Sequence, residues 1–390
     1  MTFDPVGVLP GAPDPWASSS IPAWRDASPY AMTEMIAAEP ALAERLVRRL
    51  SDDPSAAAVA DAVRAAVQAG EAILLTGCGT SEHAAVIGAA LLDDALRATG
   101  AADARVASVQ AFELLGRAQP AGLVIAVSHE GGTWATNLAI AGARDAGVRT
   151  ALITVSGRSP GAQLADLVIE TREQDQSWCH TVGYLSPMVA AAVLGGLVRG
   201  EPLDGVAVRA LLDSADDMAA AETMAASLRS CQRLLIVGSG VDHATARELA
   251  LKIEEGAHLP ATVLQLETIL HGHLAAANER TGLVLVLTDA EARGTLIVER
   301  ATAVLRSAAA LGMPAAAVIA ADLGDDIPQE LTPAGRAAVP LTNRLPRATA
   351  AALGAAIPIQ LLAERLARAR GVNPDTIGRE DHRQAAAADA

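Results

Sequence analysis

The chain has 390 residues, of which 51% are hydrophobic and only 2% are aromatic, and its formal net charge at pH 7 is −15. This length is typical of two α/β domains with connecting segments. The negative charge argues against binding to nucleic acid or to an anionic membrane surface. The scarcity of aromatic residues argues against a stacking surface for carbohydrate or RNA. Any phosphate site would therefore be built locally, from helix N-termini and hydroxyl groups.

The cysteines and the N-terminal sequence indicate the compartment. Cys78, Cys179 and Cys231 are odd in number and lack the spacing of metal ligands. They are typical of reduced thiols, which predicts a cytoplasmic protein. The N-terminal segment is acidic and proline-rich, unlike a signal or transit peptide. No membrane span is expected, because the apolar stretch Met188–Val198 has the length of a buried helix.

The first 200 residues predict an N-terminal segment followed by one α/β domain. Residues 1–50 comprise an arm rich in Pro, Gly and Ser and then helical sequence, with Pro40 as the start of a second helix. Asp52-Asp53-Pro54 marks the next helix start. Short apolar strands joined by helices indicate a parallel sheet with both faces covered. In residues 51–200 these strands are expected at 72–76, 123–127, 150–155 and 167–170.

The remaining sequence repeats this pattern. We expect a helical linker at 201–228, a second α/β domain at 229–372 and a C-terminal tail at 373–390. Gly77-Cys78-Gly79 and Gly238-Ser239-Gly240 hold equivalent places between a strand and a helix, which indicates an internal duplication. The predicted fold class is α/β with two flavodoxin-like domains, whose ligands bind at the carboxyl ends of the strands. The strands of the second domain are expected at 234–237, 283–288, 316–319 and 337–341.

Two polar turns in the first domain are candidates for an anion site. In Gly77-Cys78-Gly79-Thr80-Ser81 the glycines allow close approach of the backbone, and the following helix adds its N-terminus and two hydroxyl groups. The second turn, Ser128-His129-Glu130-Gly131-Gly132-Thr133, follows another predicted strand. Each turn alone can also be explained as a capped helix start. Two such turns at strand ends together favour a ligand site.

Three charged residues in the second domain are candidates for acid–base chemistry. Glu248, Lys252 and Glu255 are spaced by four and three residues, so they share one helix face. An exposed ladder of ion pairs is the ordinary explanation, but the apolar residues between them leave little room for a solvated face. A carboxylate and an ammonium on one face could move a proton between adjacent sugar carbons and stabilise an enediolate. His271 and His273 follow without a third ligand at a recognisable spacing, so no metal is expected. Proton transfer of this kind needs no cofactor, and none is expected.

These motifs together resemble the double SIS-domain proteins. That family includes the isomerase half of glucosamine-6-phosphate synthase, amino-sugar-phosphate deaminases and fructosamine-phosphate deglycases. The resemblance covers about residues 28–376 and includes the lead-in Met32-Thr33-Glu34-Met35-Ile36-Ala37-Ala38-Glu39-Pro40. The glutaminase half of the synthase has no counterpart in this sequence, so the ammonia-dependent synthase reaction is not expected.

The resemblance implies a role for each matching residue. The last glutamate of the catalytic helix, here Glu255, moves the proton between C1 and C2, and Lys252 and Glu248 assist it. His271 matches the histidine that opens the sugar ring, usually in the site of the neighbouring subunit, which implies a homodimer with shared active sites. Thr181 matches the threonine of a helix start that closes over the sugar. The implied substrate-binding residues are Gly79, Thr80, Ser81, Ser128, His129, Glu130, Thr133, Thr181 and Arg379.

The sequence also departs from the family pattern. Glu130 stands where the family has a serine that donates to phosphate, and a carboxylate about 4 Å from an anion costs roughly 1 to 4 kcal/mol per charge. A protonated His129 would offset this, or the substrate would carry a sulfonate or an amine instead. His273 replaces the usual proline after His-Gly. Arg379 stands in place of the synthase lysine, and a guanidinium cannot form an imine.

We therefore expect a sugar isomerase or deaminase that acts through an enediol-type intermediate on a sugar phosphate or amino-sugar phosphate. A fructosamine-phosphate deglycase and a sulfosugar isomerase are alternatives within the same family. A sugar-phosphate-binding sensor without turnover is the alternative of another class. The retained Glu255 favours an enzyme.

Overall fold

The computed structural model describes residues 3–17, 25–115, 121–288 and 296–388, and it divides into two compact units. Residues 1–2 and 18–24 of the predicted arm and residues 389–390 of the tail lie outside the described residues. The first unit comprises Met1–Pro22, Ala38–Asp175 and Val182–Arg209, and the second comprises Ala23–Ala37, Gln176–Thr181 and Ala210–Ala390.

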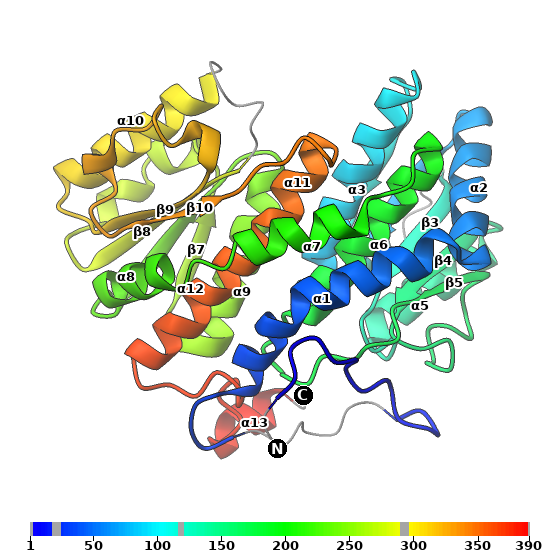
Figure 1. The fold of residues 1–390 in the computed structure, drawn as a ribbon, viewed down its shortest axis with the longest axis horizontal. Coiled ribbons are helices and arrows are strands. Elements are labelled where there is room, and N and C mark those ends of the chain that lie inside the picture. Colours follow the sequence, from blue (N-terminus) through cyan, green and yellow to red (C-terminus); the bar gives the residue numbers. More distant parts are fainter. Residues whose placement is uncertain (1–2, 18–24, 116–120, 289–295, 389–390) are drawn as a thin grey trace. The chain divides into compact units, whose positions relative to one another are not determined.

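The first unit is built on one parallel sheet (Figure 1). Its strand order is β2-β1-β3-β4-β5, which is the order of flavodoxin-like sheets. Helices α3 and α6 pack together, and α5 packs on β3 and β4. The elements are α1 (Ala31–Ser51, of which the part from Ala38 belongs here), α2 (Pro54–Gln68), β1 (Ala72–Thr76), α3 (Thr80–Ala98), β2 (Val106–Ser108), α4 (Ala111–Leu114), β3 (Ala121–Val127), α5 (Trp134–Asp145), β4 (Arg149–Thr154), β5 (Leu167–Glu170) and α6 (Val182–Arg199).

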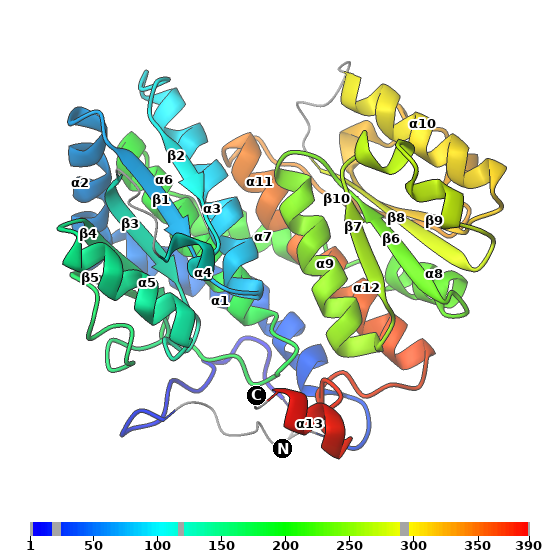
Figure 2. The ribbon, with the colours of Figure 1, turned by 180° about the vertical axis from the view of Figure 1, so that it is seen from behind.

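The second unit has a parallel sheet with the corresponding order, β10-β9-β8-β6-β7 (Figure 2). Helix α12 packs against α8 and α9. The elements are α7 (Gly205–Ser214, shared with the first unit), α8 (Met218–Leu228), β6 (Arg233–Val237), α9 (Val241–Ala257), β7 (Ala261–Leu264), η1 (Thr268–Leu270), η2 (His273–Ala276), β8 (Thr281–Leu287), α10 (Leu296–Ala310), β9 (Ala315–Ala320), η4 (Ala321–Leu323), η5 (Gln329–Leu331), β10 (Arg336–Val339), α11 (Arg347–Gly354), α12 (Ala356–Ala369) and α13 (His382–Ala388).

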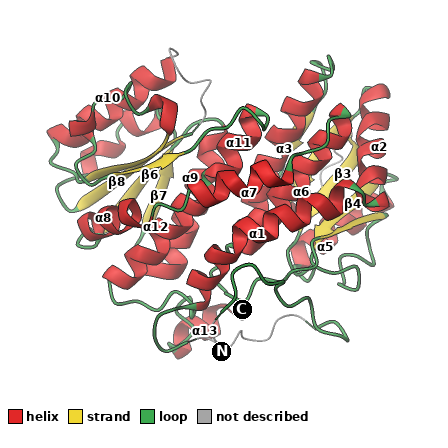
Figure 3. Ribbon diagram, viewed as in Figure 1, coloured by secondary structure: helices red, strands yellow, loops and turns green. Residues whose placement is uncertain are grey.

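The predicted fold class is confirmed, since each sheet has five parallel strands and is flanked by helices (Figure 3). The central strands are almost wholly buried, as their apolar sequences require; β8, for example, is buried at all seven positions. Because β1 and β3 are neighbours in a parallel sheet, their carboxyl ends lie at the same edge. Both predicted anion turns start at that edge.

The prediction of a second helix at Pro40 is wrong, because α1 runs from Ala31 to Ser51 with the proline inside it. An interior proline costs about 3 kcal/mol. Met35, Ile36, Leu42 and Leu46 of the same helix are each at most 3% exposed. Burial of such side chains contributes about 1.5–3 kcal/mol each, which outweighs the cost of the proline.

The N-terminal arm is fixed to the first unit by hydrogen bonds. The backbone N–H of Leu9 donates to Glu173, and Arg45 donates to the carbonyl oxygens of Val6 and Gly7. Further along the arm, a Cβ atom at Gly132 would lie 3.5 Å from the Trp16 ring. The arm therefore reaches the second anion turn.

Two helical stretches, Val182–Arg199 and Arg347–Ala369, are long and apolar enough to cross a membrane by composition. Their most apolar windows are 83% and 100% buried within the protein. Buried core helices meet the same criteria of length and apolar composition, so these two stretches are only weak support for a membrane span.

Candidate functional site

The first anion turn joins β1 to α3 through two glycines that no other residue could replace without strain. Gly79 has a φ of 56°, in the left-handed region. A Cβ atom at Gly77 would lie 2.7 Å from the backbone carbon and oxygen of Ser81. The turn therefore folds tightly onto the start of α3, and it places Thr80 and Ser81 in the first turn of that helix. A helix N-terminus with adjacent hydroxyl groups is a suitable site for an anion.

The second anion turn is equally constrained. Gly131 has a φ of 71°, and a Cβ atom there would lie 2.1 Å from the Ser159 hydroxyl. Ser128 is buried, and its hydroxyl donates to that of Thr133 at 3.4 Å. Thr133 is the N-cap residue of α5. The turn thus brings together the two hydroxyl residues that the sequence predicted as anion contacts.

The contacts of Glu130 and His129 bear on the expectation that a protonated His129 would offset the charge of Glu130. The Gln174 amide donates to the half-buried Glu130 carboxylate at 3.4 Å. His129 is buried, and its Nε2 accepts the backbone N–H of Asp175 at 3.0 Å. An imidazole that accepts a hydrogen bond at Nε2 is neutral. In this arrangement His129 does not supply the positive charge that would offset Glu130.

The equivalent turn of the second unit has the same backbone but different chemistry. Gly240 has φ 61° and ψ −132°, close to the 56° and −130° of Gly79. The next residues are Val241 and Asp242 instead of a threonine and a serine. The buried Asp242 carboxylate accepts hydrogen bonds from the N–H and the hydroxyl of Thr288, at 2.8 and 2.5 Å. The second glycine turn therefore presents a buried, hydrogen-bonded carboxylate where the first presents two hydroxyl groups.

The three charged residues of α9 form a buried cluster. The side chains of Glu248 and Lys252 are fully buried, and that of Glu255 is 25% exposed. Lys252 Nζ lies 2.5 Å from Glu255 Oε2 and 3.7 Å from Glu248 Oε1. The alternative of an exposed ion-pair ladder is therefore wrong.

Burial and mutual attraction set the protonation of this cluster. Burial alone would lower the pKa of Lys252, but the negative charges of Glu255 and Glu248 outweigh it and hold the pKa above its ordinary value. Burial raises the pKa of Glu255, although the charge of Lys252 opposes the change. The cluster thus combines a permanent cation with a carboxyl group that takes up a proton more readily than an exposed glutamate.

The segment Gln176–Thr181 adds two residues that sequence reasoning missed. The Cys179 thiol is fully buried. It donates to the Lys252 carbonyl oxygen at 3.9 Å and is also within hydrogen-bonding reach of the Glu255 side chain. The pKa of His180 is lowered to about 4, mainly by burial and further by the Lys252 charge. Thr181 is buried, and its carbonyl oxygen accepts a hydrogen bond from Gln360 at 3.3 Å. In the sequence, Cys179 and His180 directly precede the predicted residue Thr181, and this position could have drawn attention to them.

Arg379 lies over an aromatic ring. Its guanidinium carbon is 4.2 Å from the centre of the Trp178 ring, a cation–π contact. Both segments involved reach the end of α9, because a Cβ atom at Gly256 would contact Cys179 and Pro374 at 3.5 and 3.4 Å. The predicted binding residue Arg379 is thus fixed by Trp178.

His271 is not part of the buried cluster. It is 70% exposed, and its Nε2 lies 2.8 Å from Glu267, which is 59% exposed. This hydrogen bond lowers the pKa of Glu267. His273 is also exposed. In the described parts of the chain, no group of three or more His, Cys, Asp and Glu side chains is arranged to hold a metal ion.

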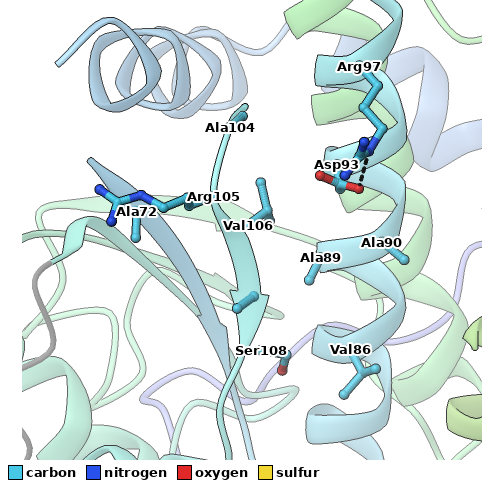
Figure 4. Close-up of a pocket in the computed structure, with 11 residues that line it drawn as sticks. Ala72, Val86, Ala89, Ala90, Asp93, Arg97, Ala104, Arg105, Val106 and Ser108 are labelled. Carbon is cyan, nitrogen blue, oxygen red and sulfur yellow. Dashed lines mark hydrogen bonds and ion pairs between the residues drawn. The ribbon is translucent and has the colours of Figure 1, made fainter. Parts of the chain in front are cut away.

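A groove of about 570 Å³ lies in the first unit between the edge strand β2 and helix α3 (Figure 4). Alanine and valine side chains line it, and the ion pair of Asp93 with Arg97 lies at one side. It contains none of the predicted site residues.

Comparison with known proteins identifies relatives of this chain. Residues 67–196 match the SIS domain family. The chain is 27% identical over 372 residues to glutamine–fructose-6-phosphate aminotransferase (isomerizing) of Streptomyces coelicolor. The matched region covers 88% of this chain and 57% of that protein. The chain spans about half the length of the curated relatives that it matches.

Solved structures show the same fold. The C-terminal domain of glucosamine-fructose-6-phosphate aminotransferase from Francisella tularensis superposes with a TM-score of 0.73 at 16% identity, over 90% of this chain and 98% of that one. Tagatose-6-phosphate ketose/aldose isomerase from Escherichia coli gives a TM-score of 0.66 at 18% identity, over 91% and 96%. The resemblance to double SIS-domain proteins that the motifs indicated is confirmed.

Proposed function

We propose that this chain, a SIS-domain protein, is an isomerase that interconverts the aldose and ketose forms of an anionic sugar, most simply a sugar phosphate. The observation that carries the proposal is the buried acid–base face of α9, where Lys252 lies between Glu248 and Glu255. Burying charges without a strong reason is unfavourable, since apolar residues often stabilise a core as well or better. A catalytic role explains why these charges are kept.

In the proposed reaction, Glu255 moves a proton between two carbons of the open-chain sugar. Its carboxylate removes the proton from C2 of the aldose, and the electron pair of that bond forms the C1–C2 double bond. The oxygen on C1 becomes negatively charged, and the Lys252 ammonium stabilises it. Glu255 then returns the proton to C1 while the hydroxyl proton moves from O2 to O1, which gives the ketose. The raised pKa of Glu255 suits both proton transfers.

The first unit supplies the proposed anion site. The N-terminus of α3 with Thr80 and Ser81, and the hydroxyl pair of Ser128 and Thr133, lie in turns that start at one edge of the sheet. Hydroxyl groups and helix N-termini bind phosphate without any lysine or arginine. Thr181 and Arg379 are further substrate contacts in this proposal.

Glu130 supports a second candidate within the same family. Its carboxylate lies in the second anion turn, where the Gln174 amide donates to it at 3.4 Å. An amine on the substrate would pair with this carboxylate. A deaminase acting on an amino-sugar phosphate, or a deglycase acting on a fructosamine phosphate, would supply such an amine.

Two further features belong to the proposal. His271 is exposed, as expected for a residue that completes the site of a second protomer in a homodimer. Cys78, Cys179 and Cys231 are free thiols in the described residues and not disulfides, which supports a cytoplasmic location.

The test is a turnover screen in D2O followed by NMR. The substrates are glucose 6-phosphate, fructose 6-phosphate, glucosamine 6-phosphate, a 6-sulfo sugar and fructosamine 6-phosphate. We expect deuterium at C1 or C2, together with the opposite isomer, from at least one. Release of ammonia would identify a deaminase, and release of the carried amine a deglycase. Binding of these sugars without exchange from any of them would identify a sensor and contradict the proposal.

A further inference from the structure

The N-terminal arm, described from residue 3 to residue 17, is attached to the first unit directly before Trp16. The backbone N–H of Gln174 donates to the Pro10 carbonyl oxygen at 2.8 Å. Arg158 then binds three consecutive residues of the arm through two carbonyl oxygens and one carboxylate, those of Ala12 at 3.3 Å, Pro13 at 3.2 Å and Asp14 at 2.5 Å. These contacts hold the arm where it leads into the tryptophan.

The segments that hold the arm also support the second anion turn. The Gln174 side chain donates to the Glu130 carboxylate at 3.4 Å, while its backbone holds the arm. Ser159, which follows Arg158 in the chain, packs against the turn, because a Cβ atom at Gly131 would collide with its hydroxyl group. The arm and the turn are thus attached to the same two segments of the first unit.

Trp16 lies at the open side of the second anion turn. A Cβ atom at Gly132 would lie 3.5 and 3.6 Å from Cη2 and Cζ2 of the indole, which belong to its six-membered ring. Gly132 and Thr133 are exposed, and Trp16 is half-buried. The ring therefore borders the part of the turn that is open next to the N-cap of α5.

This position gives the ring a possible contact with a bound sugar. An anion held by Ser128 and Thr133 would bring the carbon chain that carries it to the same opening. The C–H groups of such a chain are apolar and pack favourably on an aromatic ring. The chain has only four Trp, two Tyr and two Phe, too few for a stacking surface. A single ring is nevertheless sufficient to contact one sugar.

We propose that Trp16 is a specificity-determining residue, whose ring packs against the carbon chain of the sugar next to its anionic group. The proposal rests on the anion site of the proposed function, but not on the acid–base chemistry of α9. Trp16 would favour a phosphate carried on a carbon chain over inorganic phosphate. The N-terminal arm thus contributes to the substrate site, although it precedes the first sheet in the chain.

The test compares sugar phosphates with the bare anion in calorimetric titrations of the full chain. The ligands are inorganic phosphate and the 6-phosphates of glucose, fructose, glucosamine and fructosamine. The variants are Trp16→Ala, Trp16→Phe and, as a control, Trp134→Ala. Trp134 directly follows Thr133, is 65% exposed and pairs with Phe112 at a ring-centre distance of 6.4 Å. The control therefore removes a tryptophan near the same turn. Circular dichroism checks that each variant is folded.

The expected result is a selective loss of affinity for the sugar. For the sugar phosphate that wild type binds most tightly, Trp16→Ala should raise Kd about tenfold, because the apolar contact with the ring is lost. The Kd of inorganic phosphate should change less than about threefold, because this anion has no carbon chain to contact the ring. Trp16→Phe should restore most of the affinity for the sugar. Trp134→Ala should bind both ligands like wild type.

The other results overturn the proposal. An unchanged Kd of the sugar in Trp16→Ala would show that the ring does not contact it. An equal loss for the sugar and for inorganic phosphate would show that Trp16 only maintains the shape of the turn. Wild type that binds inorganic phosphate as tightly as every sugar phosphate would exclude the contact as well.

The turnover screen decides the proposed function separately. If binding depends on Trp16 as expected but none of the sugars exchanges or turns over, the isomerase is wrong and the role of Trp16 stands. If a sugar is turned over and Trp16→Ala binds it like wild type, the isomerase stands and the role of Trp16 is overturned. Wild type that binds neither phosphate nor any of the four sugars would contradict both.

Discussion

Lys252 is the residue on which the candidate cluster depends. It is fully buried with Glu248 and lies 2.5 Å from Glu255. The spacing of the three residues could be predicted from the sequence, because it needs only helical periodicity. Their burial was indicated only by the apolar residues between them, because the covering parts are distant in sequence: α12 packs on α9, and Cys179 and Pro374 lie near its end. His180 was missed for the same reason.

Removal of the lysine charge should destabilise the protein strongly. Lys252→Met leaves the buried Glu248 without its counter-charge, and breaking such a pair from one side costs about 3–5 kcal/mol. The double variant Lys252→Met/Glu248→Leu should recover part of this loss. The measurement is the free energy of unfolding in urea.

An exposed ion pair provides the control. Arg97 is 59% exposed and paired with Asp93, so Arg97→Met should leave the free energy of unfolding almost unchanged. Equal losses for Lys252→Met and Arg97→Met would mean that the α9 cluster is open to water.

Glu130 offers a test of the charge on the proposed substrate. If the ligand carries a phosphate dianion, Glu130→Ser should tighten binding of glucose 6-phosphate, by an amount that corresponds to roughly 1 to 4 kcal/mol for each charge of the phosphate. If the ligand carries an amine, the same change should weaken binding of fructosamine 6-phosphate. Calorimetric titration measures both, with Glu201→Ser, on the exposed pair with Arg199, as the control. Unchanged affinity for both sugars would place Glu130 away from the ligand.

At the scale of elements, the sequence predicted the central strands and the edge strands β5 and β10, and it missed the edge strands β2 and β7. The central strands are continuous apolar runs, and their predicted bounds agree with the structure within two residues. The edge strands β2 and β7 were missed because they are short and half-exposed, so they carry no apolar run. The sequence identified the two glycine turns as equivalent. Their chemistry differs because different residues follow the second glycine of each turn.

This difference yields a matched test. Gly79 and Gly240 have nearly the same φ and ψ. Replacing either by alanine puts a side chain into a backbone conformation that glycine adopts far more readily than any other residue. Both variants should therefore lose similar stability in thermal unfolding. Only Gly79→Ala should weaken binding of a sugar phosphate, since only that turn leads into Thr80 and Ser81. Equal loss of binding in both variants would contradict an anion site confined to the first unit.

At the scale of the whole molecule, the proposed homodimer explains the exposure of His271. If each protomer lends this residue to its partner, Glu255→Gln and His271→Ala protomers are each inactive alone. Mixed and refolded together, they should regain roughly a quarter of wild-type activity, because half of the molecules are heterodimers and one of the two sites in each is intact. Steady-state activity and sedimentation velocity measure this. A fully active monomer would rule the arrangement out.

The central claim is that Glu255 carries the proton between C1 and C2. The most direct measurement is the exchange of the C2 proton of the sugar with D2O, followed by NMR, for wild type and Glu255→Gln. The variant keeps the shape of the side chain and should bind substrate with an affinity within about threefold of wild type. The account predicts that exchange falls at least 1000-fold, as expected for loss of the group that moves the proton. Exchange at the wild-type rate in Glu255→Gln would contradict it.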